Sequence, residues 1–160
     1  MRLFRFGQNA APNPTPDAAP DSGEFLNPTH AAPEGVTVVM LVEDEPALRT
    51  LYGAALRRAG YYVTEARNGL EALKAVETAG RIDVVVTDLV MPFMSGAELA
   101  VQLRKDRPEL PFIFVSGYMV DEMVSGNSHL LHKPFGATAL LDKVRDVAGP
   151  PAAAGATGVD

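Results

Sequence analysis

Short apolar runs alternate with helix-like segments along the middle of this 160-residue chain. Residues 36–42 are rich in valine, as in a strand that is covered on both faces. Pro46 then suits the first turn of a helix, and apolar residues follow at spacings of three and four up to Gly60. Further strands are expected at 61–66, 82–87, 110–115 and around 130–131, and further helices at 70–79, from Ser95, at 119–126 and at 137–147.

Five strand–helix repeats predict an α/β fold with helices on both faces of a parallel sheet. We expect a flavodoxin-like, doubly wound (βα)5 arrangement with strand order 2-1-3-4-5 and a short or irregular helix at 119–126. Ser95 and Glu98 have the spacing of a capping box at the start of the third helix.

Composition divides the chain into three parts. Residues 8–35 contain six prolines and few large apolar side chains, and the chain from Gly149 is again rich in Pro, Ala and Gly. Such segments bury too little surface to offset the entropy of ordering them. We therefore predict a disordered arm at 1–35, one folded domain at 36–148 and a disordered tail at 149–160.

Charge and residue content narrow the function. The net charge of −6 argues against a nucleic-acid or anionic-membrane partner. The sequence contains no cysteine, which excludes disulfides and thiolate chemistry and fits a cytoplasmic location. No apolar run approaches the roughly 20 residues of a membrane-spanning helix.

Polar side chains gather where the expected strands end, which is where ligands bind in such sheets. Glu43 and Asp44 follow the first strand, Asp88 ends the third, Ser116 follows the fourth and Lys133 the fifth. Crowded carboxylates repel unless a cation neutralises them, and oxygen ligands with open positions suit Mg²⁺. A metal, a fixed ammonium, a hydroxyl donor and a carboxylate nucleophile are the groups that phosphoryl transfer needs.

Four stretches in this order resemble the response-regulator receiver family of two-component signalling. They are Val42-Glu43-Asp44-Glu45, Thr87-Asp88-Leu89-Val90-Met91-Pro92 with Met94-Ser95-Gly96, Val115-Ser116-Gly117-Tyr118, and His132-Lys133-Pro134-Phe135. The resemblance covers the folded unit and neither terminal segment.

The resemblance implies a role for each of these residues. Asp88 would accept a phosphoryl group from a histidine kinase or a histidine phosphotransferase. Ser116 and Lys133 would contact the phosphoryl oxygens, and the Lys133-Pro134 bond would be cis. Magnesium would be bound by Glu43 through water, by Asp44 and Asp88 directly, and by the Val90 carbonyl. The protein would then signal to a protein target, catalysing only its own phosphorylation and dephosphorylation.

Two departures and three alternatives accompany this interpretation. Leu130 stands where the family often has an aromatic switch residue, and the span from Ser116 to Lys133 is short. The chain could be the receiver segment of a hybrid histidine kinase, with the arm as a linker. It could be a Mg²⁺-dependent phosphohydrolase, although the haloacid-dehalogenase type has Asp-x-Asp where this sequence has Glu43-Asp44-Glu45. A scaffold without phosphorylation is the third alternative.

Overall fold

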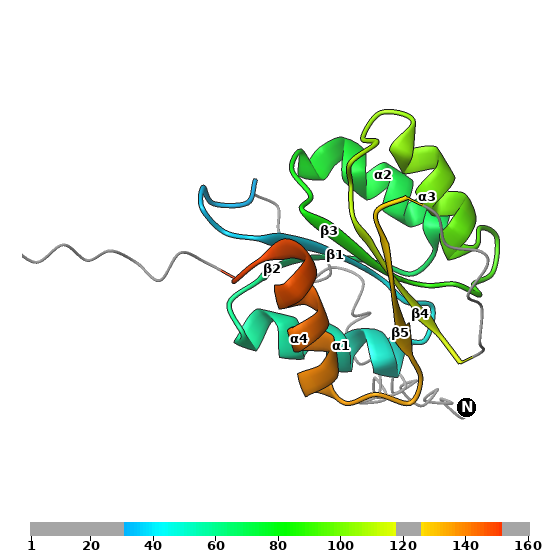
Figure 1. The fold of residues 1–160 in the computed structure, drawn as a ribbon. Coiled ribbons are helices and arrows are strands. Elements are labelled where there is room, and N and C mark those ends of the chain that lie inside the picture. Colours follow the sequence, from blue (N-terminus) through cyan, green and yellow to red (C-terminus); the bar gives the residue numbers. More distant parts are fainter. Residues whose placement is uncertain (1–30, 118–125, 152–160) are drawn as a thin grey trace, which may run out of the picture.

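The computed structural model describes residues 31–117 and 126–151 (Figure 1). Strands and helices alternate along the described chain up to β4, as the sequence predicts. The elements are β1 (Val38–Val42), α1 (Pro46–Arg58), β2 (Tyr62–Ala66), α2 (Gly69–Ala79), β3 (Val84–Asp88), α3 (Gly96–Arg104), β4 (Phe112–Ser116), β5 (Ser128–His132) and α4 (Ala137–Ala148). The helix expected at 119–126 lies almost wholly outside the described residues.

The strands form one parallel sheet in the order β2-β1-β3-β4-β5. This order confirms the predicted flavodoxin-like topology. Because β1 and β3 are neighbours in the middle of the sheet, the segments that follow them emerge side by side at its carboxyl edge.

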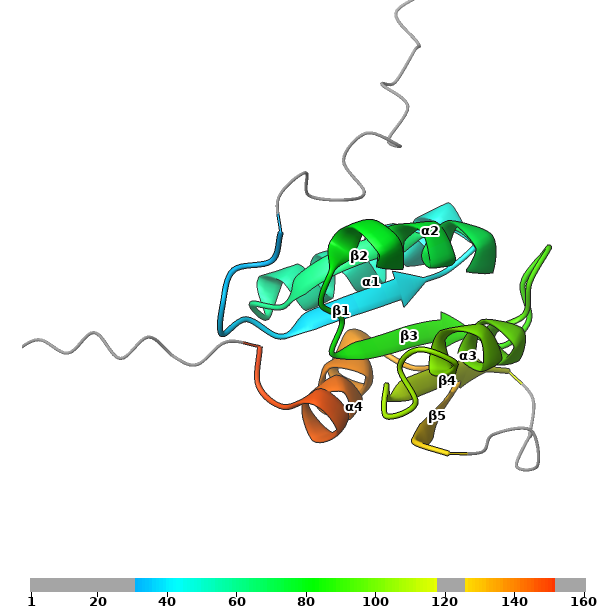
Figure 2. The same ribbon diagram turned by 90° about the horizontal axis from the view of Figure 1, so that it is seen from above.

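Helices cover both faces of the sheet (Figure 2). Helices α2 and α3 pack on one face, and α1 and α4 pack on the other. Alternate residues of each central strand point to opposite faces, so Met40 joins the core under α2 and α3 while Leu41 joins the core under α1 and α4. Both side chains are almost fully buried. The β1 strand is therefore apolar throughout because neither of its faces meets solvent.

Three strands begin two residues later than the sequence predicts. The strand expected from Val36 starts at Val38, and those expected from Ile82 and Leu110 start at Val84 and Phe112. Ile82 and Leu110 are nevertheless buried. Apolar residues that enter the core just before a strand resemble the strand itself in sequence, which explains the shift. At the other end, β3 and β4 extend one residue further, into Asp88 and Ser116.

Local sequence signals set several helix ends. Pro46 begins α1, and the predicted capping box of α3 is present, with Ser95 Oγ accepting from the Glu98 amide and Glu98 accepting from the Ser95 amide. Gly80 ends α2 with φ of 72°. Among the described residues, none of the helices combines the length and hydropathy needed to cross a membrane.

The chain after α4 returns to the start of β1. Thr37 donates from its amide to the Pro151 carbonyl at 2.8 Å and from Oγ1 to the Pro150 carbonyl at 2.6 Å. The Tyr61 hydroxyl donates to the Gly149 carbonyl at 3.0 Å. Residues 149–151, which the sequence assigns to the tail, are thus hydrogen-bonded to the domain.

Candidate functional site

The sheet register brings the polar residues at the carboxyl ends of the strands close together. Asp88 lies opposite Val115, so it sits one residue before the level of Ser116 on the neighbouring strand. Ser116 in turn lies opposite His132, and its carbonyl accepts from the Lys133 amide at 2.8 Å. The side chains predicted to act together therefore come from adjacent strands.

The predicted metal ligands form an acidic cluster. Carboxylate oxygens of Glu43, Asp44 and Asp88 all lie within 4.8 Å of one another. Glu43 is buried, Asp88 is partly buried and Asp44 is exposed. Burial raises the pKa of Glu43 from 4.5 to about 7, and the charges of Asp88 and Asp44 add to this, while a hydrogen bond from the Glu45 amide and the charge of Lys133 oppose it. The repulsion between these carboxylates decreases when one of them is protonated or when a cation binds between them.

Both carboxylate oxygens of Asp88 have partners. Lys133 Nζ donates to Oδ2 at 2.8 Å, and the Val90 amide donates to Oδ1 at 3.1 Å. Burial by itself lowers the pKa of Lys133, but the hydrogen bond to Asp88 and the charges of Asp88 and Glu43 outweigh it and raise the pKa overall. Lys133 is therefore a fixed cation beside the Asp88 carboxylate.

The amino end of α3 packs closely against the backbone of Asp88 and Leu89. The Gly96 amide donates to the Leu89 carbonyl at 3.1 Å, and a Cβ added at Gly96 would lie 2.4 Å from the Asp88 carbonyl oxygen. No side chain can occupy that space without moving Asp88 or the helix. The Gly96 position thus sets how closely α3 approaches the site.

A stacked aromatic pair supports the Lys133 loop. The Lys133-Pro134 peptide bond is cis, as the resemblance implies. The ring of Phe135, which follows it, stacks on Tyr52 of α1 with centroids 5.1 Å apart. Burial raises the pKa of Tyr52, with Glu43, Glu45 and Asp88 adding to the effect and Lys133 opposing it. The sequence interpretation missed Tyr52, because its apolar helical spacing gave no sign that it borders a charged site.

The remaining predicted site residues differ in exposure. Ser116 is buried at the end of β4, and Val90 is 71% exposed. Leu130, at the position of the family's aromatic switch, is partly buried on β5 against the core beneath α2 and α3. Ser116 therefore lies at the sheet edge that carries the acidic cluster, whereas Val90 lies in the exposed loop between β3 and α3.

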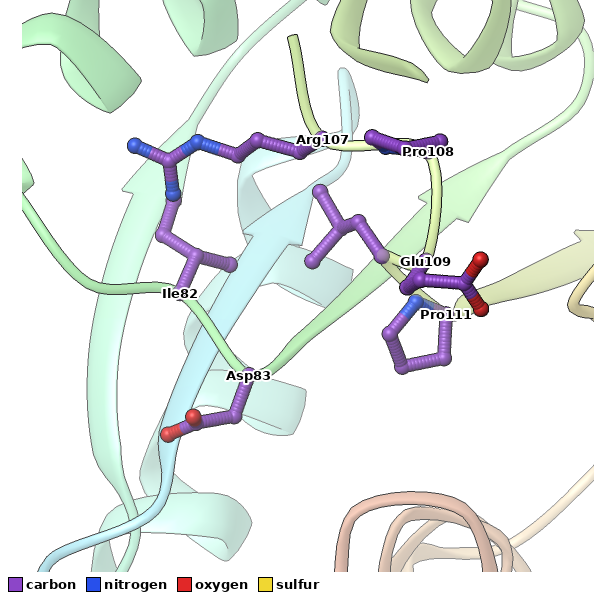
Figure 3. Close-up of a pocket in the computed structure, with 7 residues that line it drawn as sticks. Ile82, Asp83, Arg107, Pro108, Glu109 and Pro111 are labelled. Atoms are coloured by element: carbon purple, nitrogen blue, oxygen red, sulfur yellow. The ribbon is translucent and has the colours of Figure 1, made fainter.

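A separate pocket of about 370 Å³ lies at the amino ends of the strands, opposite the acidic cluster (Figure 3). It is bordered by the segments that enter β3 and β4, and its lining consists of Ile82, Asp83, Arg107, Pro108, Glu109, Leu110 and Pro111. None of these residues belongs to the acidic cluster, so this pocket plays no part in the site described above.

Comparison with known proteins identifies the family. The sequence profile described as the response regulator receiver domain matches residues 39–145. The chain belongs to the response regulator receiver domain family. The receiver domain is 42% identical over 119 residues to the Sensor kinase CckA of Brucella abortus, and 31% identical over 111 residues to the Response regulator receiver protein CpdR of the same species.

The matched lengths differ greatly between these relatives. The match with CckA covers 71% of this chain but only 13% of that protein, whereas the match with CpdR covers 66% of this chain and 92% of that protein. Among solved structures, the chemotaxis protein CheY4 of Vibrio cholerae superposes with a TM-score of 0.65 at 29% identity, covering 70% of this chain and 98% of that one. This structural neighbour shares the overall fold, so the receiver fold predicted from the sequence is confirmed.

Proposed function

We propose that Asp88 accepts a phosphoryl group from a phosphohistidine donor and that Mg²⁺ assists the transfer. The observation that carries this proposal is the 2.8 Å contact between Lys133 Nζ and Asp88 Oδ2 inside a cluster of three carboxylates. A fixed cation, an oxygen nucleophile and an oxygen-rich cation site at one sheet edge are the parts of a phosphoryl-transfer centre.

The donor atoms fit magnesium. Glu43, Asp44 and Asp88 supply only carboxylate oxygens, and the exposure of Asp44 leaves room for water and for a phosphoryl oxygen. With the Val90 carbonyl, these residues would hold the ion, Glu43 acting through water. When bound, Mg²⁺ neutralises charge that develops on the transferring phosphoryl oxygens.

The residues of the chain then divide the work of transfer. An oxygen of the Asp88 carboxylate attacks phosphorus, the new O–P bond forms as the N–P bond of phosphohistidine breaks, and the electron pair returns to the imidazole nitrogen. Lys133, held at Asp88 in the resting state, would move its ammonium onto a phosphoryl oxygen. Ser116 would donate a hydrogen bond from its hydroxyl to another phosphoryl oxygen. Both groups would stabilise the negative charge on the oxygens of the phosphoryl group.

The partners follow from the family. We propose a histidine kinase or a histidine phosphotransferase as the donor, and a protein as the target of the signal. A receiver segment of a hybrid kinase stays a second candidate, because the match with the Sensor kinase CckA of Brucella abortus is 42% identical over 119 residues.

Phosphorylation by a small donor tests the proposal. The purified protein would be incubated with Mg²⁺ and a small phosphodonor, and intact mass would report a base-labile phosphate. Asp88→Asn should incorporate none, while Asp106→Asn, which changes an exposed carboxylate outside the cluster, should incorporate it at the wild-type rate. Phosphorylation of Asp88→Asn at the wild-type rate would reject Asp88. Release of phosphate from small esters with steady turnover would instead favour the phosphohydrolase.

Heat denaturation tests the metal site. Mg²⁺ at about ten times its Kd should stabilise the native state by roughly 1.4 kcal/mol. Asp44→Ala should remove most of that gain, since it removes a direct ligand. An equal Mg²⁺ shift in both proteins would place the metal elsewhere.

A further inference from the structure

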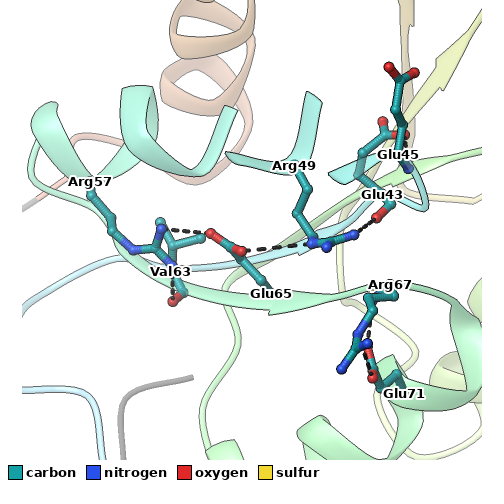
Figure 4. A network of polar contacts seen from close by, with 8 residues as sticks. All are labelled: Glu43, Glu45, Arg49, Arg57, Val63, Glu65, Arg67 and Glu71. Atoms are coloured by element: carbon teal, nitrogen blue, oxygen red, sulfur yellow. Dashed lines mark hydrogen bonds and ion pairs between the residues drawn. The ribbon is translucent and has the colours of Figure 1, made fainter. Parts of the chain in front are cut away.

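A buried ion-pair network links β2 to α1 beside the site (Figure 4). Glu65, on β2, is only 3% exposed, and its Oε1 lies 2.6 Å from Arg57 Nη1. Its Oε2 lies 4.0 Å from Nε of Arg49, which is 7% exposed. Both arginines belong to α1, about two helical turns apart, and both side chains reach Glu65 on β2. A buried carboxylate of this kind loses its solvation and requires nearby positive charge.

The helix leaves a gap for Glu65 at Gly53. A Cβ added at Gly53 would lie 2.2 Å from Glu65 Oε1 and 3.0 Å from Arg57 Nη1. Glycine at this position lets the carboxylate approach the helix backbone between the two arginines. Replacing a buried ion pair with apolar side chains is often neutral or stabilising. The free energy of folding by itself therefore does not explain why this chain buries Glu65 between two arginines.

Arg49 also reaches the loop that carries the acidic cluster. Its Nη1 donates to the Glu43 carbonyl at 2.8 Å, and the Glu43 amide donates to the Ala66 carbonyl at 3.1 Å. Both backbone polar groups of Glu43 are thus held, one by α1 and one by the end of β2. The Glu43 carbonyl belongs to the peptide unit that leads to Asp44, so Arg49 fixes the orientation of that unit.

We infer that Arg49 is a positioning residue for the cation site, acting through its hydrogen bond to the Glu43 carbonyl, with the Glu65 carboxylate as a nearby counter-charge. This inference rests on the proposed function of the cluster. Three carboxylates whose oxygens lie within 4.8 Å of one another repel when no cation is bound, so the loop that carries two of them tends to move away from Asp88. The Arg49 hydrogen bond opposes that movement and keeps the ligands preorganised.

The matched comparison uses the two arginines. Arg49→Met and Arg57→Met each remove one cation from Glu65, but only Arg49 donates to the Glu43 carbonyl. The full-length proteins would be titrated with Mg²⁺, with calorimetry giving the Kd and unfolding in chelator giving the stability. We expect Arg49→Met to weaken Mg²⁺ binding by about tenfold or more, as loss of a group that orients a ligand does. We expect Arg57→Met to change the Kd by less than about twofold, because it touches no part of the loop.

A double variant separates positioning from stability. Arg49→Met with Glu65→Met replaces the two buried members of the network by apolar side chains and leaves Arg57, whose side chain is 41% exposed, to solvent, which should preserve folding. We expect the double variant to unfold as the wild type does in chelator yet to bind Mg²⁺ as weakly as Arg49→Met.

Wild-type Mg²⁺ affinity in either Arg49 variant, or equal losses in Arg49→Met and Arg57→Met, would overturn the positioning role. If the wild type itself binds no Mg²⁺, the proposed function fails first and this inference with it.

Discussion

Lys133 and Asp88 are 45 residues apart in the chain and 2.8 Å apart in space, with Nζ donating to Oδ2. The contact joins the loop after β5 to the end of β3, across β4. It places a positive charge against one carboxylate of the acidic cluster.

Removing that charge should separate metal binding from phosphorylation. Lys133→Met takes away an ammonium that repels Mg²⁺ and competes for Asp88, so Mg²⁺ affinity should hold or rise by about threefold. Phosphorylation by a small donor should slow by about tenfold or more, because the phosphoryl oxygens lose their cation. Mg²⁺ titration and the rate of mass gain measure the two effects. A loss of both would mean that Lys133 instead holds the cluster together.

The stability of the metal-free protein should fall with rising pH. The pKa of Glu43 is raised from 4.5 to about 7, chiefly by burial. The folded state thus holds this proton more tightly than the unfolded state does. The stabilisation that this proton gives to the folded state is complete below the pKa of Glu43 in the unfolded chain, and it is lost as the pH rises through the pKa of Glu43 in the folded protein. We expect a loss of up to about 3 kcal/mol between about pH 5 and pH 8, measured by urea unfolding in chelator. Glu43→Gln should flatten this dependence, and an unchanged slope would contradict it.

Gly96→Ala should destabilise the domain and disturb Asp88. The added Cβ would lie 2.4 Å from the Asp88 carbonyl oxygen, a backbone atom that cannot move aside freely. We expect a loss of about 1–3 kcal/mol in urea unfolding. Gly136→Ala is the matched control at the start of α4, where nothing lies within 4 Å, and it should change stability by less than about 1 kcal/mol. Equal effects would show that the close approach at Gly96 has no energetic weight.

Phe93→Gly should stabilise the domain. Phe93 has φ of 70°, in the left-handed region that favours glycine, and it is 84% exposed, so little packing would be lost. Relief of this backbone strain is worth about 1–3 kcal/mol, which exceeds the roughly 0.5–1 kcal/mol lost because glycine makes the unfolded chain freer. Val90→Gly, at a 71% exposed position in the same loop, should not stabilise the domain, because it only adds freedom to the unfolded chain. Thermal unfolding of both variants makes the comparison, and a lower melting temperature for Phe93→Gly would contradict the expectation.

The two ends of the C-terminal segment should differ in importance. Truncation after Ala148 removes the carbonyls that accept from Thr37 and Tyr61, whereas truncation after Pro151 keeps them. Net hydrogen-bond values give a loss of about 1–3 kcal/mol for the shorter chain. The longer truncation product should unfold like the full chain. If both products match the full chain in urea unfolding, these contacts add nothing to stability.

Local signals explain what the sequence predicted well. The capping box of Ser95 and Glu98 depends on residues three apart in the chain, and it forms as expected. The start of α1 at Pro46 and the end of α2 at Gly80 depend on backbone preferences of single residues. Strand starts were predicted less well, because Ile82 and Leu110 are buried without belonging to the strands.

The alternation of strands and helices, and the acids, the hydroxyl and the lysine at strand ends, could be predicted from the amino-acid sequence, because these features follow from patterns within one element. The contacts between elements could not be predicted in this way and are known only from the folded structure. The contact of Arg49 with the Glu43 carbonyl, the approach of Glu65 to Gly53 and the stacking of Tyr52 on Phe135 each depend on how α1 lies against the sheet. Sequence spacing carries no information on such distances, because they are set by the packing of side chains from segments far apart in the chain.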